Sequence, residues 1–158
     1  MTSRLQTLLV ALAVTIYCGW SAREMVNSWW HTPFNRLGWL AFLIWLLPLI
    51  RETCRRRIEP LPVLLWGGLA CSLVGTIGEQ NSLCYVGVAC ALAALPQWSF
   101  AVRLLWLAAS VSWMTIFGYF MQRASVSGAN VMRLRLIAVA CAISLILFLT
   151  RRRSPVQT

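Results

Sequence analysis

Six apolar runs, separated by arginine-rich or turn-forming segments, constrain this chain more than any other feature of its sequence. A hydrocarbon core of about 30 Å asks for about 20 helical residues, with about 17 at the lower end. The first, third and fifth runs reach that length, whereas the second and sixth are shorter. We therefore expect an all-α, polytopic transmembrane helical bundle in one domain, with spans at residues 5–22, 37–50, 61–78, 83–98, 104–121 and 136–150.

The two short runs are flanked by arginine on both sides. Arg36 and Arg51 enclose the second run, and Arg135 and Arg151 enclose the sixth. Long arginine stems can snorkel to the interface and so lengthen the effective span. The alternative is a five-span bundle in which the second or the sixth run lies in the interface.

The composition is that of a membrane protein and excludes a water-soluble monomer. Apolar residues make up 59 % of the 158 residues and charged residues 11 %, against roughly 45–50 % and 25 % in ordinary soluble domains. A net charge of +10 would suggest a nucleic-acid partner in a soluble protein. Here the arginines separate the apolar runs, as in multi-pass membrane proteins. We therefore expect the protein to lie in the lipid bilayer and to have no nucleic-acid partner.

Arginine counts predict the orientation. With the N-terminus inside, nine arginines fall on the cytoplasmic side and five on the outer side, and cytoplasmic loops are the ones enriched in basic residues. We expect an integral protein of the bacterial inner membrane with both termini in the cytoplasm. Two clusters carry the bias and can also contact anionic lipids: Arg51, Arg55, Arg56, Arg57, Arg151, Arg152 and Arg153.

Small residues in the third run predict close packing between helices. Gly68, Ser72 and Thr76 lie four residues apart, and small residues at this spacing let two helices approach closely inside a bilayer. The fourth run is rich in alanine and glycine and follows after a turn at Glu79–Ser82. We expect the third and fourth runs to form a tight hairpin.

The segment Asn27–Trp39, between the first two runs, has the most unusual local sequence. Its adjacent tryptophans favour the membrane interface, and its proline fixes φ and disfavours helix in the residue before it. We predict that Trp29, Trp30, Pro33 and Gly38 form a fixed interfacial elbow that sets the depth of the second helix.

The other tryptophans divide by their position in the runs. Those near the ends of runs are expected at the interface, and those deeper inside are expected to pack between helices. The first group contains Trp20 and Trp98, and the second contains Trp45, Trp66, Trp106 and Trp113.

The polar residues offer little for catalysis or metal binding. One histidine, no aspartate and four glutamates leave few combinations, and without a C-x-x-C pair the lone His31 cannot complete the usual zinc spacing. Five of the six cysteines lie inside apolar runs, where they act as small hydrophobes, and only Cys54 lies in a charged loop. We expect no metal and no cofactor.

The string Trp29-Trp30-x-x-Pro33-x-x-x-x-Gly38, with an apolar span before it and a short span and an arginine cluster after it, resembles the N-terminal part of the exosortase/archaeosortase family. The following Ile58-Glu-Pro-Leu-Pro62, before a Leu/Gly-rich span, fits as well. The resemblance covers roughly residues 5–120. It implies a multi-pass protein concerned with sorting at the cell envelope, because members are proposed to cleave and transfer secreted proteins at a C-terminal signal with a Cys, an Arg and a His.

The catalytic part of that family is not matched here. Where the family has Tyr-Ser-His-Gly, this chain has Asn35-Arg36-Leu37-Gly38, and the segment around Cys141 lacks the Gly and Arg that follow the family's nucleophile. Apolar surroundings also disfavour the thiolate that would attack. We expect a non-catalytic relative that associates with another membrane protein or with a C-terminal sorting helix. The alternative is a component of a membrane cysteine-type transpeptidase or peptidase whose other catalytic residues lie in another chain.

Overall fold

The computed structural model describes residues 2–55 and 60–152, and within them all regular structure is helical. The elements follow one another as α1 (Thr2–Ser21), α2 (Arg23–His31), the 3-10 helix η1 (Pro33–Asn35), α3 (Gly38–Arg55), α4 (Pro62–Ile77), α5 (Asn81–Ala94), α6 (Phe100–Ser110), α7 (Thr115–Arg123) and α8 (Gly128–Arg152).

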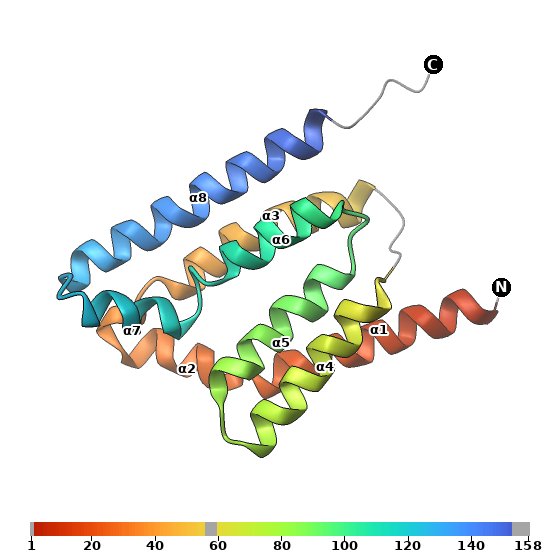
Figure 1. The fold of residues 1–158 in the computed structure, drawn as a ribbon, viewed down its shortest axis with the longest axis horizontal. Helices are drawn as coiled ribbons and strands as arrows, with labels where there is room; N and C mark the ends of the chain where they lie inside the picture. The colour runs from red at the N-terminus through yellow and green to blue at the C-terminus, as the bar shows by residue number, and fades with distance from the viewer. Residues whose placement is uncertain (1, 56–59, 153–158) are drawn as a thin grey trace.

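The chain runs back and forth along the bundle (Figure 1). α1, α4 and α6 run in one direction, and α3, α5 and α8 return in the other. The start of α1 and the end of α8 therefore lie at one end of the bundle, here called the terminal end. α2 and α7 lie at the opposite end, together with η1, which contacts both of them, and this is here called the elbow end.

The all-helical architecture is confirmed, and several helices are long and apolar enough to span a membrane, but the number of six spans is not confirmed. Three stretches are long and apolar enough to cross a membrane, namely Leu5–His31, Pro33–Cys54 and Gly128–Thr150. The pair α6 and α7 makes a fourth if the two helices, bent by 62°, are taken as one broken span. α4 and α5 are apolar helices of 16 and 14 residues, shorter than a simple crossing requires.

The second and sixth apolar runs belong to helices that are longer than the runs themselves. α3 continues through the charged segment after Ile50 to Arg55 and has 18 residues, and α8 begins at Gly128 and has 25. Arginine and glutamate are good helix formers, so charge alone does not end a helix. The shortness that motivated a five-span bundle is therefore absent from both helices.

The fifth run, expected as one span over residues 104–121, is broken in the middle. Val111, Ser112 and Trp113 each donate their backbone N–H to the carbonyl three residues earlier, which tightens the chain into a 3-10 turn. The hydroxyls of Ser110 and Ser112 also donate to carbonyls three residues earlier. Such side-chain bonds compete with the helical ladder, and the helix resumes only at Thr115.

α4 and α5 pack together more extensively than any other pair of described helices. A Cβ on Gly68 would lie 2.8 Å from the carbonyl oxygen of Gly87, so the two backbones touch there. Ser72 is fully buried in the same contact, and Thr76 is exposed at its edge, where its hydroxyl lies 3.9 Å from Cys84 Sγ of α5. Gly75 lies closer to α5, since a Cβ there would meet Cys84 Sγ at 2.7 Å.

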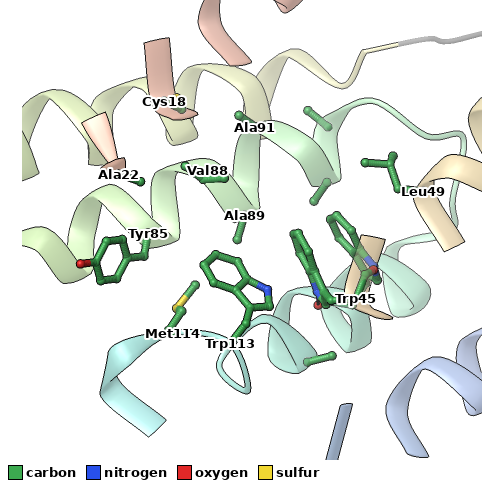
Figure 2. Close-up of a cluster of buried hydrophobic side chains, with 14 of the residues drawn as sticks. Cys18, Ala22, Trp45, Leu49, Tyr85, Val88, Ala89, Ala91, Trp113 and Met114 are labelled. Carbon is green, nitrogen blue, oxygen red and sulfur yellow. Dashed lines mark hydrogen bonds between the residues drawn. The ribbon is translucent and has the colours of Figure 1, made fainter. Parts of the chain in front are cut away.

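Stacked tryptophans fill the centre of the bundle. The rings of Trp45 and Trp106 lie 3.7 Å apart, and each indole N–H donates to the other residue's carbonyl oxygen, at 2.8 and 2.9 Å. Trp113 packs edge-on against Trp45, and Figure 2 shows it beneath Ala89 of α5. Deep packing is therefore found for Trp45, Trp106 and Trp113, whereas Trp66 is largely exposed and Trp98 is buried.

Candidate functional site: the elbow end

The predicted elbow is a continuous turn from α2 through η1 into α3. Thr32 is extended, with φ −108° and ψ 120°, as the residue before a proline favours, and Pro33 begins η1. Leu37 has φ 64°, a left-handed conformation that a branched side chain rarely adopts. The surrounding contacts therefore hold the chain in this turn before α3 begins at Gly38.

The two adjacent tryptophans have opposite environments. Trp29 is 5 % exposed and donates its indole N–H to the Trp113 carbonyl at 3.1 Å, whereas Trp30 is 69 % exposed. A Cβ on Gly38 would collide with the Trp29 ring and lie 2.9 Å from an amino nitrogen of Arg135. Glycine is therefore required for the ring to reach the α6–α7 break. Of the four predicted elbow residues, Trp29 and Gly38 are in contact. Pro33 and Trp30 are exposed, and Trp30 lines a shallow surface pocket beside Trp29, Arg36 and Leu37.

Arg135 of α8 occupies the centre of the elbow end and is fully buried. One amino group donates to the Phe34 carbonyl and to Asn35 Oδ1, both at 3.2 Å. The other lies 3.5 Å from the Trp113 carbonyl. Its acceptors in the described residues are oxygens of neutral groups and include no carboxylate. One buried cation thus joins η1, the α6–α7 break and α8.

The sequence analysis treated Arg135 as a snorkelling residue outside the sixth run, and this was wrong. α8 begins seven residues before Arg135, and Arg135 falls on the helix face that also carries Val131, Val139 and Ile143. All of these are buried, and they recur every four residues. Arg135 therefore lies within the apolar stripe of α8, and this four-residue periodicity was the signal in the sequence that indicated its burial.

Arg103 is the second buried arginine, and it acts in a similar way at the start of α6. It is 7 % exposed and donates to the carbonyls of Ala93, Ala94 and Trp98. The carbonyls of Ala93 and Ala94 end α5, where a cation is favourable, and the Trp98 carbonyl lies in the turn before α6. Of the other described arginines, five lie on the segments toward the terminal end (Arg4, Arg51, Arg55, Arg151 and Arg152) and four on those toward the elbow end (Arg23, Arg36, Arg123 and Arg133).

The residues predicted to set the topology lie at the terminal end as far as the structure describes them. Arg51 and Arg55 are in the last turns of α3, and Arg151 and Arg152 end α8. Arg56, Arg57 and Arg153 lie outside the described residues.

A pocket of about 500 Å³ opens at the elbow end between η1, the start of α5 and α7. We call it the η1–α7 pocket. Hydroxyl and amide groups alternate with aromatic rings in its lining, which contains no acid: Thr32, Phe34, Asn35, Ser82, Thr115, Ile116, Gly118, Tyr119, Phe120 and Gln122.

An apolar groove of about 320 Å³ lies where α8 crosses the α6–α7 break. We call it the alanine groove. Four of its lining residues are alanines, Ala108 and Ala109 from α6 and Ala138 and Ala142 from α8, and the rest are Leu105, Val111, Ser112 and Phe117.

The cysteines and the histidine do not gather into a reactive site among the described residues. Cys141 is exposed on α8 and Cys54 is exposed near the end of α3. The His31 ring lies 2.9 Å from the Asn27 carbonyl of its own helix. No group of three or more His, Cys, Asp or Glu in residues 2–55 and 60–152 could hold a metal ion.

Comparison of the chain with protein-family models, with curated proteins and with solved structures finds no match.

Proposed function

We propose that this protein is a non-catalytic relative of the exosortases in the bacterial inner membrane, which acts by holding a transmembrane helix of a partner. The partner is another membrane protein or a C-terminal sorting helix. Both termini are placed in the cytoplasm, in line with the arginine asymmetry between the two ends.

The alanine groove carries this proposal. Lipid tails are as apolar as leucine, so helices associate in a bilayer by close packing at small residues. Ala138 and Ala142 are one turn apart on α8 and face Ala108 and Ala109 across the groove. A second helix can approach this surface more closely than the leucine-rich faces around it. The proposed partner helix lies along α8.

The positions of the thiols and the histidine support a role without catalysis. A cysteine nucleophile needs a base within hydrogen-bond reach. Cys141 lies on the exposed side of α8, about 1.7 turns after Arg135, and the His31 ring is engaged with its own helix. Arg135, the buried cation at the elbow end, is committed to Phe34 and Asn35.

Two matched substitutions on α8 test the proposal. Ala138 and Ala140 are both exposed, but only Ala138 lines the groove. We expect Ala138→Leu to fill the groove and lower the recovery of a co-purifying membrane protein in mild detergent, and Ala140→Leu to leave recovery unchanged. Equal recovery with both variants contradicts the proposal. A partner that carries Cys-Ser-Gly-x-Arg and a later His would support the transpeptidase component instead.

A further inference from the structure

No charged side chain lines the η1–α7 pocket, but two of its lining residues, Phe34 and Asn35, accept hydrogen bonds from a buried cation. This cation is Arg135, which is fully buried and meets only neutral acceptors in the described residues. A buried cation without a counter-ion creates a strong local field, because the surroundings screen it poorly.

Asn35 transmits this field to the pocket. It is 6 % exposed and lines the pocket. A guanidinium can only donate, so the Asn35 oxygen must face Arg135, and the opposite NH₂ group is left without an acceptor in the described part of the chain. Because the oxygen accepts from a cation, the NH₂ group becomes a stronger donor.

The N-terminus of α7 adds a second source of donors. Thr115 and Ile116, the first two residues of α7, line the pocket, and Met114 before them supplies no side-chain cap. The first N–H groups of a helix have no partner within the helix, and they form the positive end of its dipole. Anions bind at such positions.

We propose that the η1–α7 pocket binds a phosphate group, presented by the headgroup of an anionic phospholipid. Asn35 and the first turn of α7 donate to the phosphate oxygens, and Arg135 supplies the compensating charge. This site is separate from the alanine groove, and it does not depend on the proposed function.

The rim of the pocket favours a lipid as the source of the phosphate. Tyr119 and Phe120 are both more than half exposed there, and aromatic rings concentrate at the headgroup level of membranes. Arg123 donates to the Tyr119 hydroxyl at 3.2 Å, so a cation stands beside the rim.

The test is a binding measurement on the full chain in mild detergent, by native mass spectrometry. The probes are short-chain phosphatidylglycerol, short-chain phosphatidylcholine and glycerol phosphate. Asn35→Asp keeps an oxygen for Arg135, removes the donor and adds a negative charge. We expect it to weaken phosphatidylglycerol binding by at least about tenfold, as expected for the loss of a charge-assisted hydrogen bond.

Asn130→Asp is the matched control, because Asn130 is exposed at the start of α8 and does not line the pocket. It makes the same charge change at the same end of the bundle and is expected to bind like the parent chain. Ser82→Trp is a second variant for the case that Asn35→Asp fails to fold. Ser82 is exposed, and an indole there fills the pocket from its mouth.

Preferential binding of phosphatidylglycerol, lost in Asn35→Asp or Ser82→Trp and kept in Asn130→Asp, supports the proposal. Equal binding by all variants overturns it. If glycerol phosphate binds as tightly as the lipid and with the same dependence on Asn35, the lipid is overturned as the source of the phosphate, and the ligand is a soluble phosphate ester. If a hydrophobic C-terminal peptide binds in the pocket and phosphatidylglycerol does not, the phosphate assignment is overturned.

Discussion

Gly38→Ala tests whether the elbow is held by the contact between Trp29 and the first residue of α3. An added Cβ would collide with the Trp29 indole and lie 2.9 Å from Arg135. Overpacking of this kind costs about 1–3 kcal/mol, and a displaced indole loses about 1 kcal/mol with its bond to the Trp113 carbonyl. Alanine gains at most about 1 kcal/mol in helix propensity. The clash wins, and we expect a net loss of about 2 kcal/mol.

Most of the cost of Gly38→Ala disappears when the opposing ring is removed. In a Trp29→Leu background the indole atoms that meet the new Cβ are gone, and only the Arg135 amino nitrogen still lies within 3 Å of it. The gain in helix propensity offsets the small shift of this side-chain end, so Gly38→Ala should then be close to neutral. The resulting coupling of about 2 kcal/mol is within the range that neighbouring residues show in a double-mutant cycle.

The assay is unfolding in mixed micelles titrated with sodium dodecyl sulfate, followed by tryptophan fluorescence. Gly67→Ala is the control, because a Cβ there meets nothing within 4 Å. It should stabilise α4 by up to about 1 kcal/mol in both backgrounds. Additive effects of Gly38→Ala and Trp29→Leu would refute the account of the elbow.

Three further outcomes follow from the positions of exposed side chains. Trp30→Ala should change stability by less than about 0.5 kcal/mol, since Trp30 is 69 % exposed; a loss as large as that of Trp29→Ala in the same micelle assay would contradict the outward position. Cys141→Ala should leave any sorting phenotype and the protein level unchanged, because the thiol is exposed on α8 and has no base beside it; a phenotype as severe as deletion would restore the enzyme hypothesis. Cys54, exposed near the terminal end, should resist a membrane-impermeant thiol reagent in intact cells and react after lysis; ready labelling from outside would reverse the orientation.

Helix periodicity explains which part of the packing could be predicted from the sequence. The apolar runs located every long helix, because burial in lipid requires continuous apolar segments. The spacing of small residues placed Gly68 and Ser72 on the α4 face toward α5, and Thr76 lies at the edge of that face, with its hydroxyl 3.9 Å from Cys84 Sγ of α5. A residue eight positions after Gly68 is rotated by about 80° around the helix axis, whereas one seven positions after it is rotated by only about 20°. Gly75 therefore lies closer to α5 than Thr76 does.

The α6–α7 break and the buried arginine could not be located from apolar runs alone. The segment Val111–Met114 contains neither proline nor glycine, and its 3-10 turn depends on donors that satisfy its carbonyls. One of these, the Trp113 carbonyl, is satisfied by Trp29 and Arg135, which are distant in the sequence. The elbow motif was visible as a string, but its partner on α8 becomes evident only in three dimensions.

Site-specific photo-crosslinking in intact membranes tests the central claim most directly. A photoreactive phenylalanine derivative is introduced at Ala138, inside the alanine groove, or at Ala140, exposed on the same helix but outside it. The account predicts a crosslink from position 138 to one membrane protein or sorting helix, and crosslinks only to lipid from position 140. A protein crosslink from position 140 and none from position 138 would contradict it.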